Sequence, residues 1–373
     1  MRVALKKHWQ RALDARWLVP CLLISGLVLT FAIAHFGLLN DYIQLVLIYV
    51  GINIILATSL NLVNGYMGEF SLAHAGFMAV GAYSSALLSM KVLPVAAHPA
   101  LFHLAVLAGG LVTALLGLLV ALPSFKVRGD YLAIVTLAFL MIVKSALENI
   151  DAIGGPRGIS GIPRLTTLPW VFCWTVALLW LIRNFVYSCY GRGVLAIRED
   201  EIASDLMSVD TRRVKVLAFM LSAFCAGIAG ALFAHLLQFI SPRVFDVVKT
   251  TEILIMVYLG GIASIGGSIL GAALYTLLLE LLRPSTVAGL LSWLPAVVFD
   301  PLNDYFIRHL GVLRMIIMPL ALVLVMLFWP RGILGLREFR GFIPRRDRRA
   351  HGAARLKGTD AHDVADSHST RET

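Results

Sequence analysis

Charged side chains are scarce in this sequence. Asp, Glu, Lys and Arg together make up 14% of its 373 residues, against roughly a quarter of an ordinary soluble domain. Hydrophobic residues account for 59%, and the mean hydropathy is +0.82. A soluble globule of this length could not cover its surface with so few polar side chains. The composition therefore excludes a soluble enzyme, a disordered protein and a disulfide scaffold, and it predicts a polytopic membrane protein.

Catalytic and metal-binding motifs are also absent from the sequence. No Gly-Lys dipeptide occurs, which excludes a Walker A loop for binding ATP phosphates. The HExxH and GxSxG patterns and Cys/His clusters at metal spacing are missing as well. The cysteines form no CxxC pair and lie in or beside apolar segments, as small buried hydrophobes do. We therefore predict no catalytic residue, no metal site and no cofactor, and any energy that the protein uses must come from elsewhere.

The charge that is present is unbalanced. Lys and Arg number 32 against 22 Asp and Glu, which gives a formal net charge of +10. The basic residues lie mainly between apolar segments and in the two tails, and no nucleic-acid-reading motif accompanies them. We therefore interpret them as residues that orient the chain against membrane lipid, and we predict no nucleic-acid partner.

Apolar segments of about 20 residues, enough to cross about 30 Å of hydrocarbon, recur along the chain. They are residues 17–37, 42–63, 76–97, 100–123, 131–147, 168–189, 216–238 and 312–329. A further segment, 253–282, has glycines near its middle and fits either one long helix or a hairpin of two. Basic residues flank both ends of the chain, so the positive-inside rule places both termini in the cytoplasm and requires an even number of crossings. We predict ten, with 253–282 as a hairpin.

The predicted fold is thus an all-α polytopic membrane protein with about ten transmembrane helices, some broken at glycines. Residues 1–16 are expected to form a basic cytoplasmic segment, and residues 17–335 a transmembrane domain with a cytoplasmic loop at 191–215. Residues 336–373 are expected to form a polar cytoplasmic tail that is disordered.

Two glycine-rich segments, 65–77 and 260–271, interrupt the apolar pattern with a similar spacing of small residues. Whether they form an internal repeat stays open, because small residues are common wherever membrane helices pack. Broken helices can turn free N–H and C=O groups toward a polar solute. We predict that both segments line a translocation path, and the alternative is that their glycines only allow close packing. The candidate path residues are Gly68, Glu69, Ser71, His74, Gly76, Gly261, Ser264 and Gly267.

The most informative polar segment is residues 191–209, GRGVLAIREDEIASDLMSV. Leu195, Ile202, Leu206 and Val209 follow one another at steps of seven, four and three, which places them on one helical face. Charged residues at 198–201 crowd the other positions. The pattern fits either a solvated connecting helix or a short helix that docks a cytoplasmic partner.

At these residues the sequence resembles the LivH/LivM family, the permeases of branched-chain amino-acid ABC importers, and it is most similar to the LivM type. The resemblance lies in GYMGEFSLAHAGFMAVGAY at 65–83, RGDYLAIVTL at 128–137, GGPRGI at 154–159, the segment 191–209 and PRGILG at 330–335. It spans about residues 42 to 335. The sequence departs from the family pattern at Glu69, where Gln is usual, and at Ala73 and Ser208, where Gly is usual. The last change removes an expected helix terminator.

The resemblance implies a subunit that forms the path for branched-chain or related apolar amino acids in the bacterial cytoplasmic (inner) membrane. It implies a related second permease subunit, two ABC ATPase subunits and a periplasmic substrate-binding protein as partners. The ATPases would dock at Arg198, Glu199, Asp200, Glu201, Ile202 and Ala203. The alternatives are a permease for urea or a short amide, a stand-alone secondary carrier and a membrane scaffold. A carrier would need ion-coupling side chains inside the membrane, which are scarce here, and a scaffold has no need of glycine-broken helices.

Overall fold

The computed structural model describes residues 18–37, 39–92, 100–125, 131–281 and 283, with positions 320, 323–324, 327–328 and 332–333. The predicted N-terminal segment 1–16 and tail 336–373 lie outside the described residues, as do the loop 126–130 and most of the predicted span 312–329.

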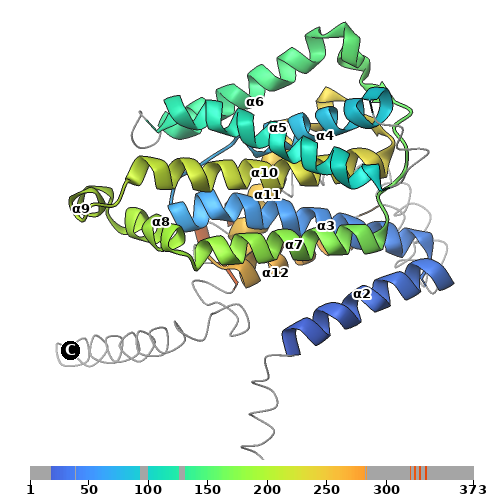
Figure 1. The fold of residues 1–373 in the computed structure, drawn as a ribbon, viewed down its shortest axis with the longest axis horizontal. Coiled ribbons are helices and arrows are strands. Elements are labelled where there is room, and N and C mark those ends of the chain that lie inside the picture. The colour runs from blue at the N-terminus through green and yellow to red at the C-terminus, as the bar shows by residue number, and fades with distance from the viewer. Residues whose placement is uncertain are drawn as a thin grey trace, which may run out of the picture.

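The described part of the chain is built from helices (Figure 1). They are α2 (Leu18–Phe36), α3 (Asp41–Asn61), α4 (His74–Leu87), α5 (Leu101–Ser124), α6 (Tyr131–Asn149), α7 (Leu168–Val186), α8 (Cys189–Glu199), α9 (Glu201–Leu206), α10 (Thr211–Leu237), α11 (Val247–Gly260) and α12 (Ile265–Leu281). The π-helical turns η1 (Leu62–Met67) and η2 (Leu88–Val92) extend α3 and α4. The 3-10 turns are η3 (Asp151–Ile153), η4 (Gly155–Arg157) and η5 (Pro242–Val244). Strand β1 (Ile159–Ser160) pairs antiparallel with β2 (Phe239–Ile240).

The predicted all-α membrane fold is confirmed. Among the described residues, five helices are long and apolar enough to cross a membrane, namely Asp41–Met67, Leu101–Ser124, Tyr131–Asn149, Leu168–Val186 and Thr211–Leu237. Each coincides with a span predicted from the apolar pattern, because uninterrupted runs of hydrophobic helix formers leave the backbone no better conformation in hydrocarbon. The total of ten crossings stays a prediction.

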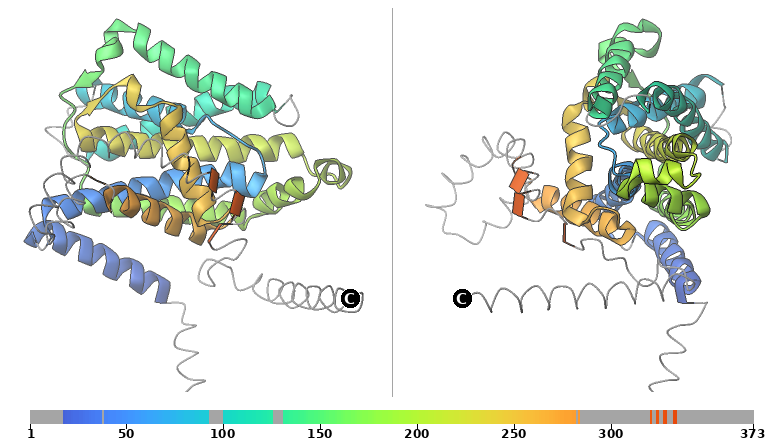
Figure 2. Two further views of the ribbon diagram at one scale, coloured as in Figure 1. Left: turned by 180° about the vertical axis from the view of Figure 1, so that it is seen from behind. Right: turned by 90° about the vertical axis from the view of Figure 1, so that its left-hand side faces the viewer.

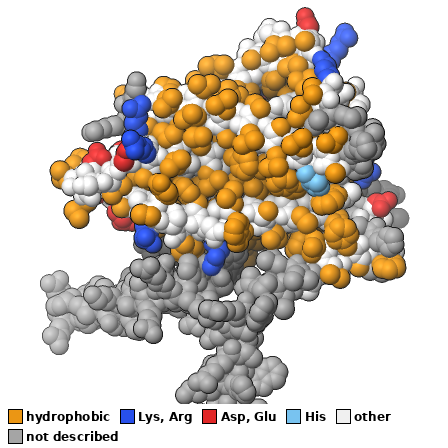
Figure 3. All heavy atoms as spheres, viewed as in Figure 1, with side chains coloured by type: hydrophobic (Ala, Val, Ile, Leu, Met, Phe, Trp, Pro, Cys, Tyr) orange, Lys and Arg blue, Asp and Glu red, His pale blue; other side chains and the backbone are white. Residues whose placement is uncertain are grey.

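The long helices place the loops at two opposite ends of the bundle. Helices α3, α5, α7 and α10 run along the long axis of the molecule, and α8 and α9 project from one end (Figures 1 and 2). The β1–β2 pair joins the loop after α6 to the end of α10 at the other. Hydrophobic side chains cover the middle of the face in Figure 3, with charged side chains mainly near its ends. This is the arrangement expected of a bundle that stands across a membrane.

The segment 253–282 contains the predicted break. Helix α11 ends at Gly260 and α12 begins at Ile265; α11 runs across the long axis of the bundle, and α12 runs along that axis and packs on α3 (Figure 2). The 14 residues of α11 rise about 21 Å at 1.5 Å per residue, which is less than the hydrocarbon thickness of about 30 Å. Helix α11 is therefore too short to cross the hydrocarbon by itself, and Ser264 in the break is fully buried. The double crossing by 253–282 stays a prediction.

The centre of the bundle is packed through backbone contacts. Helix α10 lies against α4 and α5, and a Cβ atom added to Gly81 of α4 would collide with the backbone of Gly227 in α10. Gly230 meets the backbone of Met78 in the same way. Lipid tails are as apolar as the helices, so the hydrophobic effect does not drive helix association in a membrane. Small residues let the backbones approach closely, and the resulting van der Waals contacts stabilise the packing.

The sidedness of the loops is testable with single cysteines in a background where the four native cysteines are replaced by serine. Arg157 in η4 and Arg192 in α8 are exposed at opposite ends of the bundle. We expect Arg157→Cys and Arg192→Cys to react with a membrane-impermeant maleimide in opposite vesicle orientations. Labelling of both positions from the same side would contradict the arrangement.

A pair of identical substitutions tests the backbone packing. Gly81→Ala places a methyl group into the Gly227 backbone, so we expect it to cost about 1–3 kcal/mol, as overpacking does. Gly193→Ala in α8 meets only Val214 and Val209 side-chain atoms at 3.4–3.6 Å and should be neutral or stabilising by up to about 1 kcal/mol, since alanine favours helix over glycine. The measurement is the thermal unfolding midpoint in detergent, and equal midpoints for the two variants would argue against the contact.

Candidate functional site

The first predicted break follows α3 directly. The helix loosens into the π-helical turn η1 and stops at Gly68, whose φ of +77° lies in the left-handed region that favours glycine. Residues 68–73 then run without regular structure to the start of α4 at His74. Two backbone amides of this loop are satisfied locally, because Glu69 N donates to the Val63 carbonyl at 3.2 Å and Ser71 N donates to Asn64 Oδ1 at 3.2 Å.

The two breaks meet at Asn61, the last residue of α3. Its Nδ2 donates to the Ser264 carbonyl at 3.0 Å and to Ser268 Oγ at 2.7 Å, and its Oδ1 accepts from Ala263 N at 2.9 Å. The side chain is 1% exposed, so no solvent competes for these bonds. Asn61 was not among the predicted path residues. Its signal in the sequence was an amide side chain in an apolar helix just before a glycine-rich segment, a position where burial demands a partner.

The predicted polar residues of the breaks are held by neighbouring protein groups. His74 is 1% exposed, and its Nε2 lies 2.9 Å from Ser59 Oγ of α3. The Ser59 carbonyl in turn accepts from Ser222 Oγ of α10 at 2.6 Å. Ser264 Oγ accepts from Gly267 N at 2.9 Å, and Ser71 Oγ accepts from Ala73 N at 3.4 Å. These side chains therefore shape the broken segments and join them to α3 and α10.

The predicted glycines pack tightly against backbone. A Cβ on Gly267 would lie 2.8 Å from the Gly260 carbonyl oxygen, and one on Gly76 would lie 3.4 Å from Leu140 Cα of α6. Gly261 ends α11 with φ +131°. These contacts support the alternative interpretation, in which the glycines allow close packing of the helices. The role of the eight residues as a path stays a prediction.

The docking segment is two helices rather than one, so the expected single helical face over 191–209 is wrong. Asp200 adopts an extended conformation, with φ −160° and ψ 112°, and its Oδ1 accepts from Ala203 N at 3.0 Å. The aspartate thereby caps α9 and ends α8, because its short side chain satisfies a free helix N–H better at a cap than within a helix. Leu195 consequently lies on a different helix from Ile202 and Leu206.

Helix α9 presents apolar side chains at the tip of the molecule. Ile202, Leu206 and Met207 are 67%, 81% and 79% exposed. Ser208 ends the helix in the left-handed conformation, with φ +64°, and Val209 N donates back to the Ser204 carbonyl at 3.2 Å. The terminator geometry expected of glycine is therefore kept by serine. Glu199 and Ala203 are also exposed, whereas Arg198 is half-buried against Gly68.

Glu69 and Glu201, predicted for two different sites, bind one ammonium group. Lys215 near the start of α10 places Nζ 2.7 Å from Glu69 Oε1 and 2.9 Å from Glu201 Oε1. Its side chain is only 6% exposed. Lys215 was not among the predicted site residues. Its signal in the sequence was a lysine directly before an apolar helix, since a lysine that becomes buried there needs an acidic partner.

A second ion pair lies at the start of α11. Lys144 Nζ of α6 is 2.7 Å from Asp246 Oδ2, and Asp246 Oδ1 accepts from Val247 N at 2.6 Å as α11 begins. The hydrogen bond from the Lys144 ammonium lowers the pKa of the Asp246 carboxyl. The helix that leads to the second break is thus fixed at its start by a charged cap.

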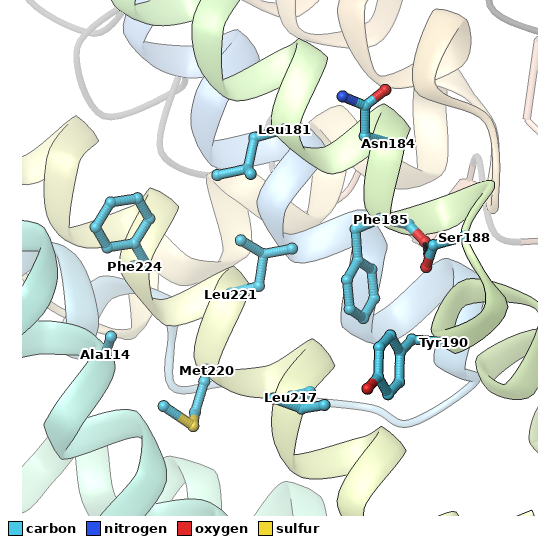
Figure 4. A pocket seen from close by; sticks show the side chains of 10 residues that line it. All are labelled: Ala114, Leu181, Asn184, Phe185, Ser188, Tyr190, Leu217, Met220, Leu221 and Phe224. Atoms are coloured by element: carbon cyan, nitrogen blue, oxygen red, sulfur yellow. Dashed lines mark hydrogen bonds between the residues drawn. The ribbon is translucent and has the colours of Figure 1, made fainter.

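A groove of about 520 Å³ opens on the side of the bundle between α5, α7 and α10 (Figure 4). It is lined by Ala114, Leu181, Asn184, Phe185, Ser188, Tyr190, Leu217, Met220, Leu221 and Phe224. None of the predicted path or docking residues contributes to it. Its mainly hydrophobic wall offers no pair of opposite charges for the two ends of an amino acid.

Residues 42–299 match the family described as "branched-chain amino acid transport system / permease component". The high-affinity branched-chain amino acid transport system permease protein LivM of Escherichia coli K12 is 34% identical over 336 residues, which cover 79% of this chain and 69% of the relative. LivM of Salmonella typhimurium is 34% identical over 318 residues, 76% and 68% of the two chains. A probable LivM of Methanocaldococcus jannaschii is 25% identical over 281 residues, 65% and 81% of the two chains. No solved structure matches the chain.

Two substitutions on α3 test the junction of the breaks. Asn61→Leu removes three hydrogen bonds and leaves the Ala263 amide unpaired, so we expect a loss of about 2–4 kcal/mol. The matched control is Asn53→Leu, which removes one bond to Thr276 Oγ1 and should cost about 1 kcal/mol. Denaturant unfolding of the two purified variants measures the difference, and equal losses would show that Asn61 has no special role at the breaks.

Proposed function

Because the chain belongs to the family of permease components of branched-chain amino acid transport systems, we propose that it carries leucine, isoleucine, valine or a similar apolar amino acid. Family members are transport components and not enzymes, and the chain is a multi-pass membrane protein that works with other transporter subunits. In our proposal the complex is an ABC importer of the bacterial inner membrane. It contains a second permease subunit, two ATPase subunits and a periplasmic binding protein.

The observation that supports this proposal best is the exposed tip of α9. Ile202, Leu206 and Met207 are largely exposed at the tip formed by α9, and charged side chains gather at this end of the bundle (Figure 3). Exposed apolar side chains rimmed by charges are typical of a protein-binding surface. We propose that this tip, with Glu199 and Ala203 beside it, contacts an ATPase. Asp200 serves as the helix cap, Arg198 is half-buried against Gly68, and Glu201 lies at the edge of this surface with its carboxylate on Lys215.

The orientation follows from that assignment. The end that carries α8 and α9 is cytoplasmic in our proposal, together with residues 1–16 and the tail 336–373. The opposite end, with β1, β2 and η4, then faces the periplasm and receives the loaded binding protein. Residues 17–335 form the permease domain between them.

The two breaks supply the polar groups that a zwitterionic amino acid needs in a hydrocarbon environment. Asn64 in η1 is 9% exposed, and its Nδ2 has no hydrogen-bond partner among the described residues. An unpaired buried donor is costly unless a ligand or water uses it. We therefore propose that the translocation path passes beside the breaks at Asn64 and Asn61, and that the second permease subunit lines its opposite side.

Docking and cargo can be tested on the assembled complex. The variant Leu206→Ser/Met207→Ser removes two apolar contacts, so we expect ATPase binding to weaken at least about ten-fold, as when interface anchors are truncated. Val248→Ser, 59% exposed at the start of α11, is the matched control and should bind ATPase normally. Co-purification measures binding, and uptake of radiolabelled leucine into proteoliposomes measures transport.

Two results would contradict the proposal. A double variant that retains full ATPase binding would argue against α9 as the docking tip. A wild-type complex that takes up urea and ignores leucine would overturn the cargo.

A further inference from the structure

The loop between the first break and α4, residues 68–73, is a junction of three parts of the bundle. Leu72 N donates to Thr136 Oγ1 of α6 at 3.0 Å, and the Leu72 carbonyl accepts from Thr250 Oγ1 of α11 at 3.3 Å. Ser71 N is bound by Asn64 of η1. Any displacement of this loop would therefore break or shift its hydrogen bonds to α6, to α11 and to η1 at the end of α3.

The docking helices reach the same loop at two points. The side chain of Arg198 in α8 packs on Gly68, where an added Cβ would lie 3.0 Å from Arg198 Cγ. Glu201 at the start of α9 reaches Glu69 through the shared Lys215 ammonium. One side chain of a third element, α10, thus connects the start of α9 to the loop after the broken helix.

Three side chains surround the ammonium group of Lys215. Its ammonium lies over the Phe125 ring at the end of α5, 5.8 Å from the ring centroid, as well as between the two carboxylates. Glu201 is 42% exposed and Glu69 is 21% exposed, so one carboxylate is at the docking surface and the other is inside. Low exposure strengthens ion pairs relative to those in water and makes removal of one partner costly.

We propose that Lys215 is a positioning residue that transmits movement of the docking helix α9 to the first helix break through Glu201 and Glu69. This inference rests on the proposed function, since it assumes that an ATPase binds and moves α9. Without the Lys215 contacts to Glu201 and Glu69, the ATPase would still dock and hydrolyse ATP, but its movement would no longer displace the loop 68–73. The quantity that it controls is therefore the number of amino acids imported per ATP hydrolysed.

The test uses the complete complex in proteoliposomes, with binding protein saturated with leucine. We expect Lys215→Met, which keeps the length and removes the charge, to lower leucine uptake per ATP hydrolysed at least about five-fold, the lower end of typical site-to-site coupling. Lys215→Arg, which can still bond both carboxylates, should restore most of that ratio. The control is Lys91→Met, which removes a lysine from η2, at the far end of the continuous helix that begins with α4 at His74, and should leave the ratio unchanged.

A double-mutant cycle identifies the route. If Lys215 links Glu201 to Glu69, adding Glu201→Gln to Lys215→Met should lower the ratio no further, whereas independent effects would multiply. Should Lys215→Met fail to assemble, Glu201→Gln alone removes the exposed arm and is expected to lower the ratio by itself.

The proposal is overturned if assembled Lys215→Met or Glu201→Gln imports as much leucine per ATP as the wild type. It is also overturned if Lys215→Met loses ATPase binding, because the bridge would then shape the docking surface only. Failure of the proposed function appears in the wild type, which would import no leucine, and is thus distinct from failure of this inference.

Discussion

A backbone amide or carbonyl freed by a helix break inside a membrane bundle has no water to bond, so another part of the protein must satisfy it. In this chain Asn61 meets that demand for the second break, through Ala263 N and the Ser264 carbonyl. Asn64 meets it for the loop after the first break, through Ser71 N. Because both asparagines lie at the end of α3 and in η1, the two breaks are forced to lie together. The positions of α4, α11 and α12 depend on this junction.

Two groups of ion pairs complete the arrangement. Lys215 joins the loop after the first break to α9, and Lys144 with Asp246 fixes the start of the helix that leads to the second. Each break is therefore held through one group of ion pairs, while α4 and α10 are held together by backbone packing over glycines such as Gly81. A bundle with rigid central contacts and polar connections at its ends can move the broken segments without separating its long helices.

The docking segment shows where a periodic pattern misleads. The spacing of Leu195, Ile202 and Leu206 fits one helix, yet Asp200 divides it, because capping by an aspartate outweighs the small gain from continuing a solvent-exposed helix. Ser208 shows the converse. The sequence lacks the expected glycine there, and the chain nevertheless adopts the left-handed turn, since the hydrogen bond from Val209 N to the Ser204 carbonyl closes the helix end.

The sequence by itself determined the membrane class, the long spans, the break inside 253–282 and the family, because these depend on local hydrophobicity, glycine content and motifs along one stretch of chain. Only the tertiary structure decided which polar residues meet. Asn61 lies 203 positions from Ser264, and Lys215 lies 146 positions from Glu69. No local pattern encodes such pairings. They arise because hydrocarbon and close packing leave each buried polar group few possible partners, and the folded bundle selects among them.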